Sequence, residues 1–252
     1  MTHTLEVLFT PADFGALRER DLSATTCVVF DILRATTTML TALANGATAV
    51  IPVSEIAAAI AIRQRQSDVL LAGERDGVRI VAAQTGGVDF DLGNSPREFT
   101  PEHVRGRTIV TTTTNGTRAL RAVAPAKTVL IGAFLNLRAL ATWIQQQPVE
   151  SLLLVCSGTH EQAALEDTLA AGALCDLIWS EYSASELADS AQMAREIYRQ
   201  SATDLLGAME HSRNGRRLLA MPELCADVPF CLQRDTLDLL ATLGKDGAVR
   251  RV

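Results

Sequence analysis

Carboxylates, arginines and threonines stand where several apolar stretches of the sequence end. Asp31 and Arg34 follow one such stretch, and Glu74 and Arg75 follow residues 69–71. Arginine binds phosphate oxygens through paired N–H groups, and carboxylates beside a phosphate suit Mg²⁺, a hard cation that prefers oxygen ligands. The pattern therefore favours metal-assisted phosphoryl transfer or hydrolysis of an anionic substrate.

A second loop, IVTTTTNGTRAL, places Thr114, Asn115, Gly116 and Thr117 after another apolar run. A helix that begins there would offer free N–H groups and a partial positive charge to an anion. Gly116 lacks a Cβ, and we expect a ligand oxygen to approach the backbone at this point. Ordinary helix capping by threonine and asparagine is the alternative explanation.

A turn is predicted within residues 89–99, where Asn94 and Ser95 precede Arg97. Gly, Asn, Ser and Pro together are typical of turns, and the arginine could reach an anion from there. We expect this turn to contribute to substrate binding.

The stretch CSGTHEQAALEDTLAAGAL begins at the end of an apolar run with Ser157 and Gly158, and then enters a helix that carries Glu166 and Asp167. Adjacent residues on a helix do not face the same way. We expect one of these two carboxylates to point into the site and the other to face away.

Several other chemistries lack their required spacing. The dinucleotide motif G-x-G-x-x-G follows no predicted strand, and the P-loop lysine motif is absent. A cysteine phosphatase loop needs an arginine where Cys156 is followed by Gln162, and a haloacid dehalogenase would have a second Asp where Leu33 stands. The four histidines form no pair with metal-ligand spacing, and we expect them at the surface, with His160 the least certain because of its loop.

The elements that must position these groups are short apolar runs that alternate with helical patterns. The predicted strands are 4–9, 26–31, 48–53, 68–72, 107–112, 127–132 and 151–156. The predicted helices are 36–45, 54–65, 115–123, 135–146, 161–178, 184–200 and 201–207. This alternation predicts a three-layer α/β/α fold with a largely parallel or mixed sheet, and the segment 180–220 reads as a helical subdomain or cover.

An internal repeat of the sequence supports this architecture. Residues 28–61 fall on residues 108–141 without a gap, so that Thr37 meets Thr117 and Ala42 meets Ala122. Two βαβα units would place equivalent loops at strand ends, where ligands bind in open α/β sheets. Chance similarity of alanine-rich sequence is the alternative. We expect one unit over 1–252, with a division into lobes of about 1–105 and 106–252 left open.

Composition narrows the class of partner. The 252 residues carry a net charge of −6, which argues against binding to a nucleic-acid backbone. The sequence starts without a signal-peptide pattern and has no membrane-length apolar stretch, so we expect a cytoplasmic protein. Five scattered cysteines predict buried free thiols. The alanine-rich helices would suit a homo-oligomer, although the sequence does not fix the oligomeric state.

Several stretches, in this order, resemble the 2-phosphosulfolactate phosphatase (ComB) family nearly from end to end. They are VVFDILRATTTMLTALANGA, AGERDG, FDLGNSPREFT, GRTIVTTTTNGTRAL, LEDTLAAGAL and residues 224–230. The resemblance implies a duplicated α/β fold and a Mg²⁺-dependent phosphatase acting on the phosphate ester of a sulfonated lactate, as in coenzyme M biosynthesis. The stretch GTHEQAALED departs from the more glycine-rich segment that is expected there.

The candidate residues and the family resemblance, taken together, predict a mechanism. We expect Mg²⁺ to bridge Asp31 and one or more of Glu74, Glu166 and Asp167 to the phosphate. Arg34 and the amides of residues 114–117 would neutralise the transition state, and the remaining polar groups named above would bind the substrate. The attacking group is left open between a metal-activated water molecule and a carboxylate, of which Asp31 is favoured.

Other functions remain open at this point. The same loops could form a non-catalytic module that binds an anion or a nucleotide, or a phosphoryl transferase that acts on a small acid. A pure anion binder would gain nothing from carboxylates beside its ligand. A different small phosphorylated 2-hydroxy acid is an alternative substrate.

Overall fold

The computed structural model describes residues 4–182 and 186–252. It contains all seven predicted strands, and the sequence-based assignment of these elements is confirmed. They are β1 (Thr4–Leu8), β2 (Thr25–Phe30), β3 (Ala49–Pro52), β4 (Leu70–Arg75), β6 (Thr108–Thr112), β7 (Thr128–Gly132) and β8 (Ser151–Cys156). Every residue of β2 is buried, because strands cover both of its edges and helices cover its faces.

Four short strands complete one sheet but were not predicted. They are β5 (Val78–Arg79), β9 (Glu186–Leu187), β10 (Ala241–Leu243) and β11 (Val249–Arg251). The strand order is β5-β4-β6-β3-β11-β10-β7-β2-β8-β1-β9. The C-terminal hairpin of β10 and β11 therefore lies in the middle of the sheet and joins its two halves.

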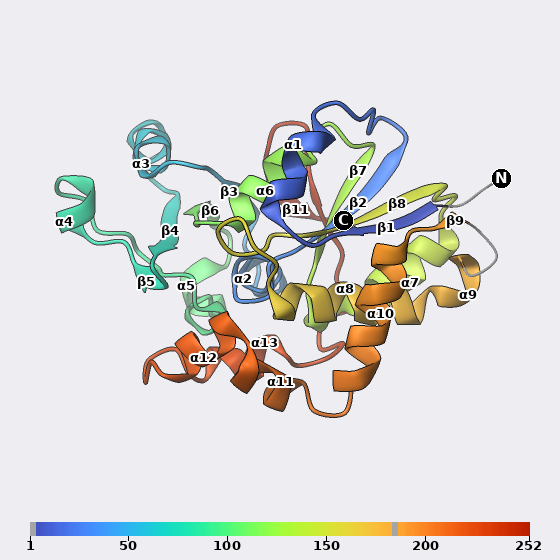
Figure 1. Cartoon of the computed structure of the whole chain (residues 1–252). Coiled ribbons are helices and arrows are strands. Elements are labelled where there is room, and N and C mark those ends of the chain that lie inside the picture. Colours follow the sequence, from blue (N-terminus) through green and yellow to red (C-terminus); the bar gives the residue numbers. More distant parts are fainter. Residues whose placement is uncertain (1–3, 183–185) are drawn as a thin grey trace.

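This hairpin reverses the direction of the strands. The group β4, β6 and β3 is parallel, and so is the group β7, β2, β8 and β1. The pairings of β3 with β11, β11 with β10 and β10 with β7 are all antiparallel, so the two groups run in opposite directions. The sheet twists across its width (Figure 1), and the segments that follow β2 and β6 still line one pocket.

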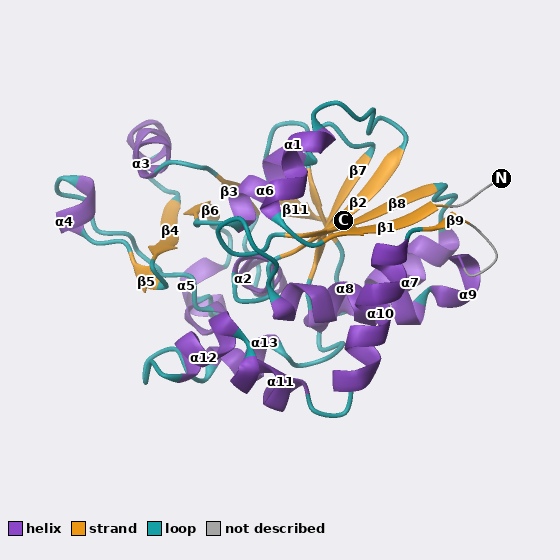
Figure 2. Ribbon diagram, in the orientation of Figure 1, coloured by secondary structure: helices purple, strands orange, loops and turns teal. Residues whose placement is uncertain are grey.

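Seven longer helices correspond to predicted helices. They are α2 (Ala35–Ala44), α3 (Ile56–Arg65), α6 (Gly116–Ala122), α7 (Leu137–Gln146), α8 (Leu165–Leu177), α10 (Asp189–Ser201) and α11 (Leu205–His211). Figure 2 shows helices on both sides of the strands, with α8 and α10 below them and α6 above. The predicted three-layer α/β/α class is confirmed.

Three helix predictions need correction. The predicted helix 201–207 is displaced, because Ser201 ends α10 and α11 begins only at Leu205. The predicted helix 161–178 begins only at Leu165, because residues 159–162 form a tight turn closed by backbone hydrogen bonds between Thr159 and Gln162. The predicted helix 184–200 is helical only from Asp189. Its residues 184 and 185 lie outside the described part of the chain, and β9 at residues 186–187 adds a strand beside β1.

Six further helices of four to seven residues lie in the described ranges. They are α1 (Phe14–Leu17), α4 (Ala82–Thr85), α5 (Pro101–Val104), α9 (Trp179–Tyr182), α12 (Arg213–Leu219) and α13 (Asp227–Cys231). Figure 1 shows α11, α12 and α13 together below the sheet, on the side of α2. The predicted helical cover is thus present, apart from the strand β9 within it.

The repeat seen in the sequence corresponds to a repeat in the structure. The order β2-α2-β3-α3 recurs as β6-α6-β7-α7. Each copy pairs its first strand with the second strand of the other copy, as β6 with β3 and β2 with β7. This exchange is what brings the loops after β2 and β6 to the same place.

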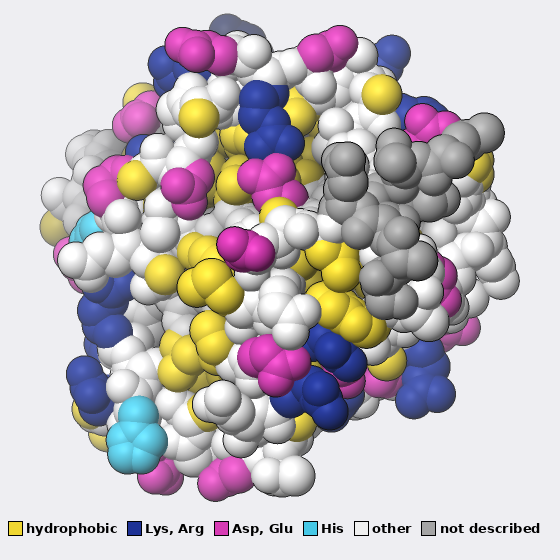
Figure 3. All heavy atoms as spheres, turned by 45° about the vertical axis from the view of Figure 1, so that its right-hand side comes forward, with side chains coloured by type: hydrophobic (Ala, Val, Ile, Leu, Met, Phe, Trp, Pro, Cys, Tyr) yellow, Lys and Arg dark blue, Asp and Glu magenta, His cyan; other side chains and the backbone are white. Residues whose placement is uncertain are grey.

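The helices, one face of the surface and the cysteines can be compared with the composition of the sequence. No helix in the described ranges is long and apolar enough to cross a membrane. Figure 3 shows acidic and basic side chains interspersed on one face, without a large patch of either sign among its described residues. Four cysteines are buried free thiols, whereas Cys225 is only half-buried, contrary to the expectation for all five.

Candidate active site

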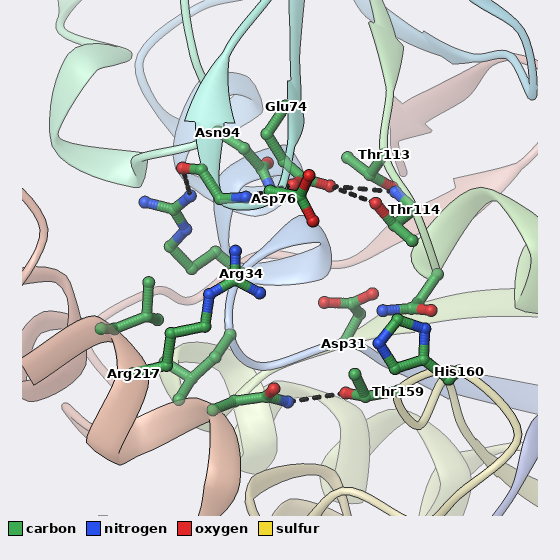
Figure 4. A pocket seen from close by; sticks show the side chains of 15 residues that line it. Asp31, Arg34, Glu74, Asp76, Asn94, Thr113, Thr114, Thr159, His160 and Arg217 are labelled. Atoms are coloured by element: carbon green, nitrogen blue, oxygen red, sulfur yellow. Dashed lines mark hydrogen bonds between the residues drawn. The ribbon is translucent and has the colours of Figure 1, made fainter. Parts of the chain in front are cut away.

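A pocket opens where the loops after β2, β4, β6 and β8 meet helix α12 (Figure 4). Sequence reasoning placed functional groups on each of these four loops, and the structure brings all four loops together. Asp31, Glu74, Asn94 and Asn115 are among the lining residues. Helix α12 contributes a wall that the sequence did not reveal.

Asp31 follows the last residue of β2 and lies before the first turn of α2. It is 8% exposed, and its Oδ1 accepts a hydrogen bond of 3.0 Å from the Ala35 N–H. Burial raises the pKa of the Asp31 carboxyl to about 7, against the lowering effect of the Ala35 hydrogen bond. The charges of Glu74 and Glu166 contribute to this rise. Asp31 can therefore exist in either protonation state near neutral pH.

Gly116 opens α6 and packs directly against Asp31. A Cβ at Gly116 would lie 2.8 Å from Asp31 Oδ2 and 2.7 Å from the Ala35 Cβ. Because Gly116 has no side chain, the loop that carries Asp31 can pack against it; the two residues belong to different copies of the repeat. The expectation that Gly116 admits a ligand oxygen is corrected, because Asp31 and Ala35 fill that space.

Glu74 ties two of the loops together. Its Oε1 accepts hydrogen bonds of 3.0 Å from both the N–H and the hydroxyl of Thr114, and its Oε2 accepts one of 2.7 Å from the Gly77 N–H. Asp76 and Gly77 form a two-residue hairpin turn between β4 and β5, and both have positive φ, as is typical of an Asp-Gly turn. Glu74 therefore fixes the position of Thr114 and of this turn.

Glu166 and Asp167 lie in the first turn of α8, and each is only 2% exposed. Both side chains are therefore turned into the protein, and neither faces solvent. Asp167 accepts hydrogen bonds of 2.8 Å from the Ile32 N–H and 3.0 Å from the Gly158 N–H. Asp167 thus joins the loop after β2 to the loop after β8. Neither Glu166 nor Asp167 lines the pocket.

The carboxylates of this region influence one another. Burial raises the pKa of Asp167 well above its ordinary value, and the charges of Asp31 and Glu166 raise it further. Burial also raises the pKa of Glu166, although a hydrogen bond from the Asn214 side chain lowers it in part. Added positive charge in the pocket would relieve this repulsion.

Arg34 lines the pocket, but its charge is already balanced. One guanidinium nitrogen donates to Asp227 Oδ2 at 2.6 Å and the other to the Gly77 carbonyl at 2.7 Å. The Asp227 carboxylate, on α13, also accepts a 2.6 Å hydrogen bond from Ser95 and lies 3.6 Å from Arg97. Asp227 was not singled out in the sequence, where the only signal was its place within the family stretch 224–230.

Four predicted substrate-binding residues are not in the pocket lining. Arg75 donates to its neighbour's carbonyl at 2.7 Å and to the Thr112 hydroxyl at 3.1 Å, and Thr117 donates to the Thr113 carbonyl. Arg97 and Ser95 contact Asp227 instead. In this structure these residues bond the loops around the pocket, and their predicted role in substrate binding stays a prediction.

The predicted residues after β8 also lie outside the lining. Ser157 is fully buried, and its hydroxyl has no hydrogen-bond partner within the described chain. Gly158 adopts a positive φ of 60°, and a Cβ there would lie 2.5 Å from the Gln162 carbonyl. The turn that leads to His160 therefore requires a glycine at position 158.

The sequence analysis missed several residues that line the pocket. Thr113, Thr159, His160, Asn214 and Arg217 belong to this group. His160 comes from the loop that was flagged as unusual. Nothing in the stretch RNGRRLL distinguishes α12 from a charged surface helix, because its proximity to the strand ends is a tertiary effect.

The pocket offers oxygen donors of the kind that Mg²⁺ prefers. The buried Thr113 hydroxyl has no hydrogen-bond partner in the described chain, and Asp31 Oδ2 is not engaged by a hydrogen bond there. Mg²⁺ commonly takes one or two protein carboxylates and completes its shell with water and substrate phosphate oxygens. The donor set fits that mode of binding.

A magnesium site made by four carboxylates is not formed. No group of three His, Cys, Asp or Glu side chains among residues 4–182 and 186–252 is placed to hold a metal ion. Both oxygens of Glu74 and of Asp167 already accept hydrogen bonds from the protein. Asp31 and Asp76 are the lining carboxylates without such a double commitment in the described chain, and Asp31, the buried one of the two, is the better placed for a metal held together with the substrate.

A family model and named relatives match this chain along most of its length. The family model described as 2-phosphosulpholactate phosphatase covers residues 14–246. A "Probable 2-phosphosulfolactate phosphatase" of Caldanaerobacter subterraneus subsp. tengcongensis is 37% identical over 243 residues, which cover 94% of this chain and 95% of that protein. Proteins of the same name from Thermotoga petrophila and Nostoc punctiforme are 38% and 35% identical, over 86% and 93% of this chain and 88% and 94% of their own lengths.

Proposed function

The chain belongs to the 2-phosphosulfolactate phosphatase family, and on that premise we propose that it hydrolyses the phosphate ester of 2-phospho-3-sulfolactate or a similar small 2-hydroxy acid with the help of Mg²⁺. The observation that carries this proposal is the buried Asp31 in the pocket wall, with one carboxylate oxygen uncommitted and a pKa of about 7. A pure anion binder would be weakened by such a carboxylate, which a phosphatase can use.

The residues around Asp31 would each act on the phosphate in a different way. Thr113 and Asn115 offer hydroxyl and amide donors at one wall of the pocket, beside Thr114, whose N–H and hydroxyl both donate to Glu74. When bound, Mg²⁺ would neutralise negative charge on the phosphate oxygens. Glu74 would act as a positioning residue, because it holds Thr114 by two hydrogen bonds.

Two roles are available to Asp31. As a nucleophile, its ionised oxygen would form a bond to phosphorus while the ester oxygen leaves with the bonding electrons and takes a proton from water. As a ligand and base, Asp31 would orient and deprotonate the attacking water. Rapid quenching of a reaction with ³²P-labelled ester separates the two, because only the nucleophilic route leaves label on Asp31.

The proposal is tested by measuring inorganic phosphate released from 2-phospho-3-sulfolactate, 2-phospholactate and a nucleotide, with Mg²⁺ and with EDTA. We expect Mg²⁺-dependent release from the two small acids and a loss of about 10²–10⁴-fold in kcat for Asp31→Asn. Asp246→Asn changes an exposed carboxylate that does not line the pocket and serves as the matched control. Binding without turnover would favour an anion-binding module, and product formation on added alcohols would favour a transferase.

The biological setting is part of the same proposal. The family resemblance supports a role in coenzyme M biosynthesis and a cytoplasmic location, and the net charge of −6 supports the absence of nucleic-acid binding. Self-association stays a prediction, which light scattering coupled to size-exclusion chromatography would check.

A further inference from the structure

Two arginines line the pocket in the described part of the chain, and they differ in what balances their charge. Arg34 is buried against Asp227, with side-chain exposures of 2% and 0% for the pair. Arg217 lies on the exposed face of α12 and has no hydrogen bond or ion pair with any described residue. The Arg217 guanidinium is therefore fully available to a ligand, whereas Arg34 already uses one N–H of each terminal nitrogen and has its charge balanced by Asp227.

The position of Arg217 is defined by the anchoring of α12. Asn214 donates to the Thr159 hydroxyl at 2.7 Å, and Arg213 donates to the Gln162 side chain at 2.6 Å. Figure 4 shows the Arg217 side chain reaching from this helix into the pocket, toward the space between Arg34 and Asp31.

Gly77 gives this side chain room. A Cβ at Gly77 would lie 3.3 Å from a terminal nitrogen of Arg217, closer than ordinary contacts allow. The hairpin turn between β4 and β5 thus leaves space on its inner side for the guanidinium. The same turn is fixed by Glu74 and by Arg34, which bond its N–H and its carbonyl.

We propose that Arg217 is a specificity-determining residue that binds the second acidic group of the substrate, its carboxylate or sulfonate, through the paired N–H groups of its guanidinium. The inference rests on the proposed function, in which the phosphate lies at the Asp31 end of the pocket beside Thr113 and Thr114. Arg217 enters from the opposite wall of the pocket, which is formed by helix α12 and not by a loop that follows a strand. Phosphate esters without an acidic group would leave Arg217 unpaired and bind more weakly.

The kinetic consequence differs from that of a catalytic residue. The carboxylate or sulfonate keeps its charge throughout the reaction, so Arg217 would hold it equally in the ground state and in the transition state. Loss of such uniform binding raises KM and leaves kcat nearly constant. A charge-assisted pair of hydrogen bonds corresponds to roughly a 10- to 100-fold change in kcat/KM.

The test compares Arg217→Ala with wild type on 2-phospho-3-sulfolactate, 2-phospholactate and isopropyl phosphate, which carries no second acidic group. We expect KM for 2-phospho-3-sulfolactate to rise about 10- to 100-fold, with a much smaller effect on kcat/KM for isopropyl phosphate and partial rescue by Arg217→Lys. A large effect on 2-phospholactate would identify the carboxylate as the bound group, and its absence would identify the sulfonate. Equal losses on all three esters would overturn the proposal.

Arg216→Ala is the matched control, because Arg216 is exposed on the same helix, bonds the His211 carbonyl and does not line the pocket. Its kinetics should equal those of wild type. Titration calorimetry with 3-sulfolactate, which has no phosphate, measures the Arg217 contact without turnover, and Arg217→Ala should weaken this binding by the same factor. Unchanged 3-sulfolactate affinity would contradict the inference, whereas intact binding without phosphate release from any ester would contradict only the proposed function.

Discussion

Asp31→Asn should stabilise the metal-free protein at alkaline pH while removing its phosphatase activity. Burial raises the pKa of Asp31 from 3.8 to about 7 in the folded state. A carboxyl whose pKa is raised by folding binds its proton more tightly in the folded protein than in the unfolded chain. Its contribution to stability is fully present below the unfolded-state pKa and is lost as the pH rises through the folded-state pKa. Wild type therefore bears the cost of the buried charge above about pH 7, and an asparagine does not.

The magnitude follows from the size of the shift. A rise of about three pKa units corresponds to about 4 kcal/mol of unfavourable free energy at pH 8, which is an upper bound. Asparagine replaces the charge-assisted hydrogen bond from Ala35 with a weaker neutral one and adds an amide that needs an acceptor, so we expect a net gain of about 2 kcal/mol in the free energy of unfolding.

The assay is urea denaturation of both proteins in EDTA at several pH values from 4 to 8. The difference in unfolding free energy should be small or negative at pH 4 and should grow in favour of Asp31→Asn up to pH 8. Asp246→Asn should show no such gain, because a hydrogen bond from Arg250 lowers the pKa of that exposed carboxyl to about 2. A variant that is less stable than wild type at pH 8, with no pH-dependent difference, would refute the reasoning about Asp31.

Three further predictions concern the supports of the pocket. Gly116→Ala should lower kcat and destabilise the fold by about 1–3 kcal/mol, because the added Cβ would meet Asp31 and Ala35. Gly15→Ala is the control: its added Cβ would have nothing within 4 Å, so kcat and stability should stay near wild type. Equal melting temperatures of the two variants would contradict this prediction. Asp227→Ala should cost about 3–5 kcal/mol in urea denaturation by leaving a buried arginine unpaired, and a loss below 1 kcal/mol would show that the pair is not structurally important. EDTA should stop phosphate release, and added Mg²⁺ should restore it. Mg²⁺ should also raise the melting temperature of wild type more than that of Asp31→Asn. Activity that persists in EDTA would contradict the proposed need for a metal.

The sequence predicted the parts of the fold that depend on local pattern. Apolar runs of four or five residues, such as those in β2 and β8, were found because strands buried on both faces are largely apolar. The strand β11 has two exposed residues and pairs with β3, about 200 residues earlier in the chain, so no local signal marks it. The reversal of strand direction in the sheet depends on this hairpin and could not be predicted.

The candidate site shows the same division. Asp31, Glu74, Asn94, Thr114 and Asn115 were found because each follows a strand or a recognisable turn, and the structure places them in one pocket lining. Partners that come from distant segments were missed.

The partner of Arg34 is 193 positions away at Asp227, and helix α12 reaches the pocket only through tertiary packing. For this reason the sequence showed neither that Asp227 balances the charge of Arg34 nor that Asp31 and Ala35 fill the space beside Gly116.

A crystal structure with Mg²⁺, 3-sulfolactate and orthovanadate, a phosphate analogue, would test the central claim most directly. The account predicts vanadate beside the free oxygen of Asp31 and within hydrogen-bond distance of Thr113 or Thr114, with an acidic group of 3-sulfolactate on Arg217. Vanadate bound elsewhere, with the pocket between Asp31 and Arg217 holding only water, would contradict it.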